Sequence, residues 1–136
     1  MKTTNYRNTF ILIAEDCPVS KSEIPQKKSG KDTVASIQYE MIKKQPYKYT
    51  SDEVIFNVFI KKNGIDKKDE KSEREKFFAK NQACLRSSPL GKRYGWGIHH
   101  NNEEKIAIYP VESSEYKKLS MDKVITKLKA MRSKRA

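Results

Sequence analysis

The hydrophobic pattern begins with a short run from Thr9 to Ala14 that is rich in β-branched and aromatic residues and gives way to polar residues before Pro18. An apolar run of this length without alternation is typical of a strand buried on both faces. Residues 18–31 are mostly Lys, Ser, Pro and Gly, with few apolar positions. The pattern therefore predicts a strand inside a sheet, followed by a long surface loop.

Two helices are predicted between residues 32 and 64. In the first, Asp32 is placed to cap the N-terminus, the apolar positions 34, 37, 41 and 42 share one face, and Pro46 ends the helix. The β-branched and aromatic residues of 50–64 favour a strand. The ends of that segment favour a helix, because Thr50 and Glu53 form a capping box and Gly64 supplies a C-terminal cap. We therefore predict a second helix there.

A third helix is predicted after the charged run 67–71, which we expect to be solvated. Arg74, Phe77, Phe78 and Cys84 belong to the pattern of this helix, and its two phenylalanines are expected to face the core. A Ser-Pro pair and a glycine at positions 88–91 then interrupt the chain.

A β-hairpin is predicted from two segments, 94–100 and 105–111, that alternate apolar and polar residues. The four residues between them are all polar, as is usual for a hairpin turn. Both strands are expected to join the N-terminal strand in one sheet.

The C-terminal part is predicted to form two helices. Ser113 or Ser114 caps a short helix through Leu119. From Ser120 onward, apolar residues at positions 121, 124, 125, 128 and 131 follow helical spacing, which predicts a helix at about 121–133 with a basic opposite face. Together these elements predict one α+β domain over residues 1–136: a small, mainly antiparallel sheet made of the N-terminal strand and the hairpin, covered by four or five helices.

Charge adds a functional hypothesis to this picture. The formal net charge is +12, and residues 113–136 contain 8 basic and 2 acidic side chains, which is +6 in 24 residues. A clustered positive field attracts phosphate-bearing or acidic partners. The alternative is compositional bias, since Lys far exceeds Arg. The candidate anion-binding patch consists of Lys123, Lys127, Lys129, Arg132, Lys134 and Arg135.

The location expected from the sequence is the cytoplasm. No apolar stretch approaches the roughly 20 residues of a membrane helix. The N-terminus also lacks the apolar core of a secretory signal, which has about 7 to 15 residues. Cys17 and Cys84 are therefore expected to be reduced.

Three blocks of the sequence carry a family resemblance: Thr9–Ile11 with the Asp-Cys-Pro that follows, the segment 46–53, and above all Cys84–His99. Over nearly its whole length the chain resembles a family of short bacterial proteins known only as a domain of unknown function. This resemblance implies a bacterial, cytoplasmic, single-domain protein. It implies no activity and no catalytic residues.

Candidate catalytic and metal-binding residues are few. Cys84 and His99 are the one conceivable pair of nucleophile and base, because a thiol needs a nearby imidazole or positive field to form a thiolate. A buried structural cysteine is the alternative. Cys17, Cys84, His99 and His100 lack the close pairs of a structural zinc site, and adjacent histidines on a strand point to opposite faces. We expect no metal and no cofactor.

A small-ligand site is conceivable between positions 86 and 99. A guanidinium offers a planar fork for phosphate or carboxylate, and two serine hydroxyls before Pro89 add donors. On a regular strand, however, Trp96 and His99 would face opposite ways. The candidate ligand-binding residues are Arg86, Ser87, Ser88, Arg93, Trp96 and His99.

Three functional hypotheses follow. The leading one is a non-enzymatic binding module for an anionic partner, with nucleic acid or another polyanion as the candidate, that uses the basic C-terminal helix. The second is a small-molecule enzyme or ligand-binding protein with a site in the segment Cys84–His99. The third is a structural adaptor with neither activity.

Overall fold

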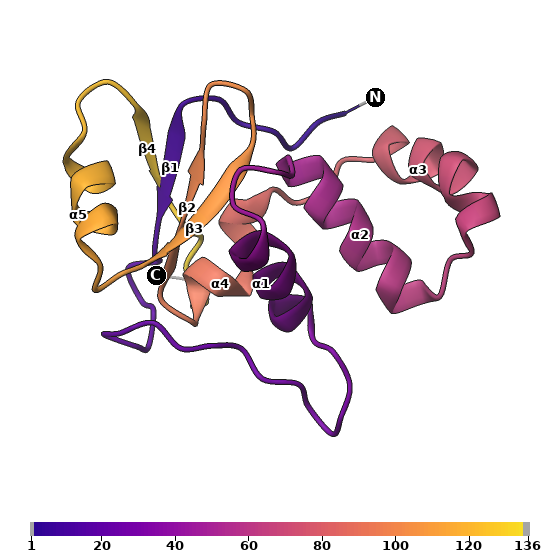
Figure 1. Ribbon diagram of the computed structural model, residues 1–136, viewed down its shortest axis with the longest axis horizontal. Helices are drawn as coiled ribbons and strands as arrows, with labels where there is room; N and C mark the ends of the chain where they lie inside the picture. Colours follow the sequence, from indigo (N-terminus) through magenta and orange to yellow (C-terminus); the bar gives the residue numbers. More distant parts are fainter. Residues whose placement is uncertain (1, 135–136) are drawn as a thin grey trace.

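The computed structural model describes residues 2–134 and has α+β architecture, as predicted. Four strands form one sheet, five α-helices pack around it or extend from it, and two short 3-10 turns lie between helices (Figure 1). In chain order the elements are β1 (Thr9–Leu12), α1 (Val34–Lys44), α2 (Ser51–Asn63), η1 (Lys67–Asp69), α3 (Glu70–Ala79), η2 (Leu85–Ser87), α4 (Pro89–Lys92), β2 (Trp96–His100), β3 (Ile106–Pro110), α5 (Ser114–Met121) and β4 (Thr126–Lys129).

The sheet has the strand order β3-β2-β1-β4 and is mixed. β1 pairs antiparallel with β2, and β2 pairs antiparallel with β3, as the predicted strand and hairpin require. β1 also pairs with β4, and this pairing is parallel, with Thr9 opposite Thr126. β1 is therefore an inner strand, with a neighbouring strand on each side.

The predicted basic helix at 121–133 is wrong. Helix α5 ends at Met121, and residues 126–129 form the edge strand β4. Helical spacing had assigned Met121, Val124 and Met131 to a buried stripe, yet all three side chains are exposed. Hydrogen bonding explains the difference, because the open edge of β1 offers this segment backbone partners that outweigh its helical pattern.

Two helix boundaries also differ from the predictions. The N-cap of α1 is Thr33 and not Asp32, because the Thr33 side chain accepts the Ser36 N–H while Ser36 bonds back to Thr33. Helix α3 contains Phe77 and Phe78 but ends at Ala79, so Cys84 lies in the loop before η2. The capping box of Thr50 in α2 forms as predicted.

The two faces of the sheet are covered differently. On one face, Ile11 of β1 and Ile98 of β2 pack with Leu90 of α4 in the main hydrophobic core, against which α1 also lies. On the opposite face, Phe10 and Tyr116 of α5 meet edge to face, with ring centroids 5.1 Å apart. Figure 1 shows α5 on one side of the sheet and α1 and α4 on the other.

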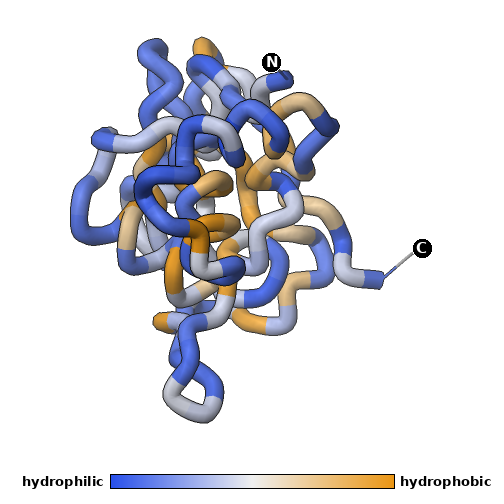
Figure 2. The backbone as a smooth tube through the Cα atoms, turned by 90° about the vertical axis from the view of Figure 1, so that its right-hand side faces the viewer, coloured by the Kyte–Doolittle hydropathy of each residue, from blue (hydrophilic) through white to orange (hydrophobic). Residues whose placement is uncertain are grey.

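Helices α2 and α3 project from the sheet as a unit that we call the α2–α3 arm, residues 51–79 (Figure 1). The aromatic side chains of this arm pack on one another, for instance Phe59 against Phe77 with centroids 4.8 Å apart. Figure 2, which views the molecule from the side of the arm, shows hydrophobic segments gathered inside and hydrophilic residues along the outer turns. None of the helices within residues 2–134 is long and apolar enough to cross a membrane.

The long loop predicted at 18–31 is present and hangs below the body of the molecule in Figures 1 and 2. It is fixed near its middle, where the Trp96 indole N–H donates to the Glu23 carbonyl at 2.9 Å. The Glu112 carboxylate accepts bonds from the Ser22 backbone and hydroxyl. The loop is therefore anchored to β2 and to the turn before α5.

Candidate functional site

The described residues 123–134 form what we call the C-terminal cationic segment. Its five basic side chains are all exposed, whereas Arg135 of the predicted patch lies outside the described residues. Alternation along β4 places Lys127 and Lys129 on the α5 side of the sheet and Leu128 on the core side. The basic side chains of the segment are Lys123, Lys127, Lys129, Arg132 and Lys134.

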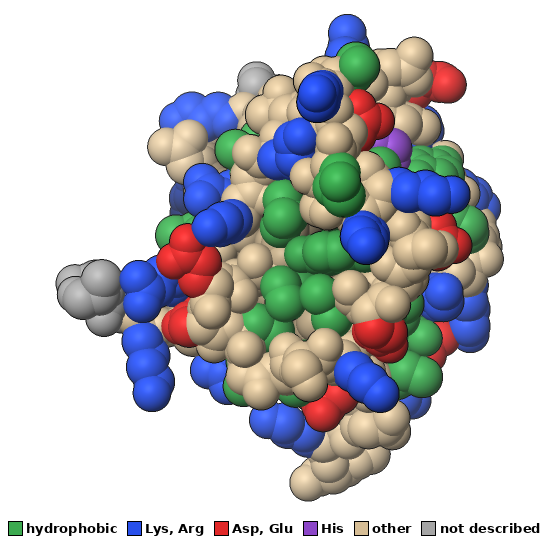
Figure 3. Space-filling view, turned by 90° about the vertical axis from the view of Figure 1, so that its left-hand side faces the viewer, with side chains coloured by type: hydrophobic (Ala, Val, Ile, Leu, Met, Phe, Trp, Pro, Cys, Tyr) green, Lys and Arg blue, Asp and Glu red, His purple; other side chains and the backbone are tan. Residues whose placement is uncertain are grey.

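Two acidic residues in the turn after β1 offset part of this charge. Lys129 Nζ lies 2.6 Å from Glu15 Oε1, and this bond lowers the pKa of the Glu15 carboxyl. The Asp16 carboxylate accepts the backbone N–H groups of Ser133 and Lys134, which lowers its pKa as well. In Figure 3, which looks onto the end of the molecule with α5 and β4, Lys and Arg side chains surround a strip of hydrophobic side chains, with a few acids among them.

Arg86 secures the C-terminal end of β4. Its Nε donates to the Lys129 carbonyl at 2.8 Å, and the Met131 N–H donates to the Arg86 carbonyl at 2.8 Å. One N–H of the guanidinium that was predicted to bind a ligand thus bonds to the edge strand. Next to it, the Ser87 hydroxyl contacts the Met131 sulfur at 3.2 Å.

The remaining members of the predicted ligand site point in different directions. The Ser88 hydroxyl is buried, bonds to Gln38 Oε1 at 2.5 Å and caps α4. Arg93 is exposed, and the Trp96 ring is buried against Tyr39. His99 faces the opposite side of the sheet, as strand alternation required. The structure therefore does not bring the six residues together around one cavity.

Cys84 and His99 have separate partners. The Cys84 thiol lies 3.1 Å from the Tyr6 hydroxyl, and burial together with this contact raises the pKa of Tyr6 to about 12. Cys84 is on the core side of the sheet, where it lines a cavity of about 220 Å³ with Gln38 and Ser88. Since His99 faces the other side, the two residues do not form the nucleophile and base pair that the sequence allowed.

His99 belongs instead to a polar cluster on the α5 side of the sheet. The Tyr47 hydroxyl lies 2.8 Å from His99 Nδ1 and 2.7 Å from the Tyr109 hydroxyl. Burial lowers the pKa of His99, and the charge of Asp122 opposes that shift. Tyr47 reaches this position from a turn with φ of 59°, which a non-glycine residue seldom adopts. The signal in the sequence is the aromatic residue directly after Pro46, a pairing that marks a turn.

His100 points to the core side and is fully buried. The Tyr6 ring meets it edge to face, with centroids 5.3 Å apart. Within the described residues, neither ring nitrogen makes a well-formed hydrogen bond, although the carbonyls of Ile98 and Thr9 lie near enough to favour the charged form slightly. Burial dominates and lowers the pKa of His100 to about 4, so the ring is neutral at pH 7.

The part of the chain that the structure describes contains no group of three or more His, Cys, Asp or Glu side chains arranged to hold a metal ion. Cys17 and Cys84 are both free thiols there. A cluster of ligands, rather than one residue type, is what gives a metal site its affinity.

One hollow of the described chain was not predicted from the sequence. A groove of about 710 Å³ lies along the α2–α3 arm, and we call it the arm groove. The Lys67–Lys71 run, interpreted from sequence as solvated, supplies two of its basic side chains. The signal available beforehand was the i, i+4 spacing of Lys67 and Lys71, which places both on one side of the chain as it enters α3. The lining residues are Met41, Tyr49, Glu53, Phe56, Asn57, Ile60, Lys61, Lys67, Glu70, Lys71 and Arg74.

Comparison with known proteins places the chain in a family and gives no activity. The model of a family of unknown function, DUF6157, matches residues 1–136, which is the whole chain. No curated protein and no solved structure matches significantly. The chain therefore belongs to the DUF6157 family, in agreement with the resemblance of its Cys84–His99 block.

Proposed function

We propose that the protein is a non-enzymatic binding module for an anionic polymer, with nucleic acid as the first candidate, and that the C-terminal cationic segment contacts this partner. The observation that carries the proposal is the exposure of all five described basic side chains of 123–134 along one strand and its flanks. Lys129 is the only one of them with an ion pair among the described residues. Exposed lysines that follow an extended backbone suit a row of phosphates. We also propose a cytoplasmic location, which the two unbridged cysteines support.

The test is the salt dependence of binding to duplex and single-stranded DNA and RNA, read by fluorescence anisotropy from 50 to 200 mM salt. Each phosphate neutralised on duplex DNA contributes a slope of about −0.9 in log K against log salt. Replacing Lys127, Lys129 and Arg132 with Ser should weaken binding and flatten the slope by about 2 to 3.

A variant with the same loss of charge at Lys21, Lys27 and Lys28, which are exposed in the loop 18–31, is the matched control. Glu15→Gln should have the opposite effect and tighten binding, because it releases Lys129 from its ion pair. If neither DNA nor RNA binds at 50 mM salt, or if both triple variants weaken binding equally, the proposal fails and compositional bias explains the charge.

A small-molecule site in the segment Cys84–His99 is the second candidate. The cavity of about 220 Å³ beside Cys84 and Ser88 supports it. Typical ligand cavities are larger, about 300 to 1,000 Å³, and the Ser88 hydroxyl is already bonded to Gln38. Phosphorylated and carboxylated metabolites should be screened by thermal shift against the wild type and Ser87→Ala. A ligand whose stabilisation is lost in Ser87→Ala would favour this candidate over the first.

A further inference from the structure

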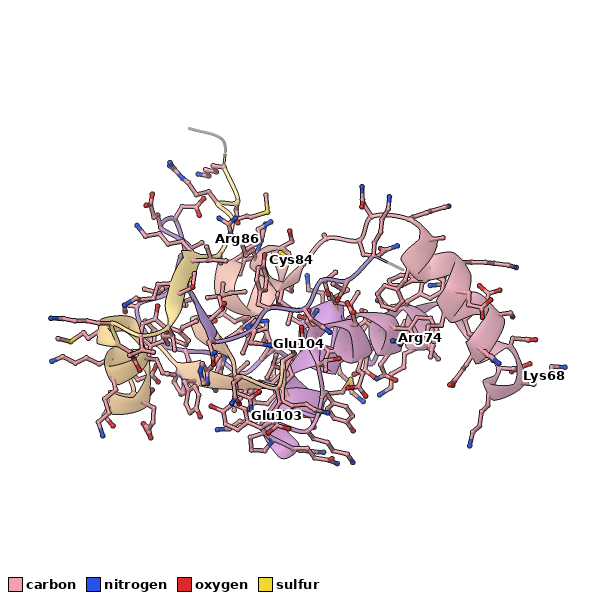
Figure 4. All side chains as sticks on the ribbon, turned by 90° about the horizontal axis from the view of Figure 1, so that it is seen from above. Lys68, Arg74, Cys84, Arg86, Glu103 and Glu104 are labelled. Carbon is pink, nitrogen blue, oxygen red and sulfur yellow. The ribbon has the colours of Figure 1, made fainter. Side chains whose placement is uncertain are left out.

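Arg74 occupies an unusual position in the arm groove. Its guanidinium carbon lies 4.9 Å from the centre of the Phe78 ring and 5.7 Å from that of Phe56, within the range of cation–π contact. Phe56 and Phe78 are buried, and Arg74 itself is half-buried. Figure 4 shows Arg74 between α2 and α3, whereas Lys68 lies at the outer end of the arm.

The N–H groups of this guanidinium have no protein acceptor within residues 2–134. Glu70 precedes Arg74 by one helical turn, the spacing of a favourable ion pair. The Glu70 carboxylate and the Arg74 guanidinium are nevertheless not within ion-pair distance of each other. The guanidinium lies over the phenylalanine rings instead. The guanidinium thus lies over two aromatic rings without a hydrogen-bond partner among the described residues, and its N–H groups are the part of arginine that binds phosphate or carboxylate through two parallel hydrogen bonds.

The rest of the groove is suited to a ligand with an anionic end and an apolar end. Four cationic side chains and two carboxylates line it, so the anion is favoured. Tyr49 and Ile60, which are partly exposed, provide aromatic and aliphatic surface against which a planar ring can pack. The Asn57 side chain also lines the groove, where its Nδ2 donates to the Met41 sulfur at 2.8 Å and its carbonyl oxygen adds an acceptor.

We propose that the arm groove binds a small organic anion in which a planar aromatic ring is joined to a phosphate group, the chemistry shared by mononucleotides and phosphotyrosine. Arg74 binds the phosphate through its N–H groups, and Lys67 and Lys71 add charge. The aromatic ring packs against Tyr49 and the neighbouring apolar side chains. A volume of about 710 Å³ falls within the usual range of roughly 300 to 1,000 Å³ for ligand sites.

The experiment is isothermal titration of the full chain at 50 mM salt with AMP, UMP and phosphotyrosine, and with adenosine and inorganic phosphate as the two halves of a ligand. At least one of the complete ligands should bind saturably, and each half should bind at least tenfold more weakly. Arg74→Met keeps the contact with the phenylalanines but removes the fork, and should weaken binding by about tenfold to a hundredfold. Arg74→Lys should also weaken binding, because an ammonium cannot bind phosphate through a planar fork.

Lys68→Ala is the control, since Lys68 is exposed on the same arm but does not line the groove. Melting curves of each variant establish that it is folded, and Arg74→Lys keeps the test decisive if Arg74→Met does not fold. The C-terminal variant that combines Lys127→Ser, Lys129→Ser and Arg132→Ser should bind the small ligands normally, which separates this site from the polymer surface.

The inference is overturned if no complete ligand binds, if inorganic phosphate binds as tightly as AMP, or if Lys68→Ala and Arg74→Met weaken binding equally. Binding of phosphotyrosine without mononucleotides would support the inference and identify a phosphorylated peptide as the source of the ligand. Binding of mononucleotides without phosphotyrosine would support it with a nucleotide as the source.

Discussion

At the scale of single residues, the most consequential feature is a neutral imidazole held in the core. His100 is fully buried on the side of β2 that faces the main core, with Tyr6 against its ring. The folded state excludes water from the ring, and this cost to the charged form exceeds the favourable effect of the nearby Ile98 and Thr9 carbonyls, while the unfolded chain solvates the ring freely. Protonation of this residue therefore opposes folding.

The first prediction is that the free energy of unfolding depends on pH through His100. The pKa of His100 is about 4 in the folded state, below its ordinary value of 6.5, so the unfolded chain takes up a proton first as pH falls. Above pH 6.5 the ring is neutral in both states and does not lower the free energy of unfolding. As pH falls from 6.5 to about 4, the unfolded chain binds the proton and the free energy of unfolding decreases. Between pH 7 and pH 5 the loss should be about 2 kcal/mol.

Urea unfolding of the wild type and of His100→Leu at both pH values measures this loss, since the variant lacks the titrating group. The wild type should lose about 2 kcal/mol more than His100→Leu over this interval. His99→Gln is the control, and it should retain most of the wild-type pH dependence. Equal pH dependence in wild type and His100→Leu would contradict the buried, neutral state of His100.

At the scale of elements, the packing of α5 on the sheet depends on the absence of a side chain at Gly97. A Cβ atom built at this position would lie 2.7 Å from the Tyr116 ring and would also overlap the Phe10 ring. These two rings form the edge-to-face pair that joins α5 to β1. The Tyr116 hydroxyl continues this contact by accepting the Ile13 N–H at 3.0 Å. A small residue in β2 thus lets α5 approach the sheet closely.

Gly97→Ala should therefore destabilise the fold by about 1 to 3 kcal/mol, the usual cost of overpacking a core. Chemical denaturation followed by Trp96 fluorescence measures the change. The same substitution in a Tyr116→Ala background should cost less, because one of the two obstructing rings is gone. An equal cost in both backgrounds would show that Tyr116 is not the obstacle.

At the scale of the whole molecule, the N-terminal segment, residues 2–8, connects the α2–α3 arm to the sheet. The buried Asp52 carboxylate, at the start of α2, accepts hydrogen bonds from the Thr4 N–H at 2.8 Å, the Thr4 hydroxyl at 2.7 Å and the Thr3 hydroxyl at 2.6 Å. The Lys2 N–H donates to the Phe78 carbonyl in α3. The same segment then continues into β1, so one stretch of chain contacts α2, α3 and the sheet.

Removal of residues 2–4 should leave the Asp52 carboxylate buried without these donors. We expect a loss of about 2 to 4 kcal/mol in the free energy of unfolding, since hydrogen bonds to a charged group are among the stronger ones. The truncation should also accelerate hydrogen exchange more in α3 than in β1–β3, because the Phe78 carbonyl loses its hydrogen bond to the Lys2 N–H. Asp52→Ala in the full chain should destabilise by a similar amount, and the two changes should not add. Additive effects would contradict this link.

Elements whose signals are local could be predicted from the sequence. The capping box of Thr50 and Glu53, the left-handed Gly64 that ends α2, and the alternating hairpin strands each depend on residues a few positions apart, and each formed as predicted. Strand alternation also anticipated that Trp96 and His99 would face opposite ways. Local hydrogen bonding and side-chain period decide such features before the rest of the chain is considered.

Features that depend on partners far away in sequence could not be predicted from local patterns. Residues 121–131 have helical spacing, but Thr126 lies opposite Thr9, and the open edge of β1 supplies hydrogen bonds that no local pattern encodes. The same holds for Arg86, whose Nε donates a hydrogen bond to β4. It also holds for the arm groove, where Arg74 of α3 contacts the Phe56 ring of α2. A contact between distant segments forms only when the whole chain can offset its conformational entropy. The sheet order and the candidate binding surfaces were therefore decided by the fold as a whole.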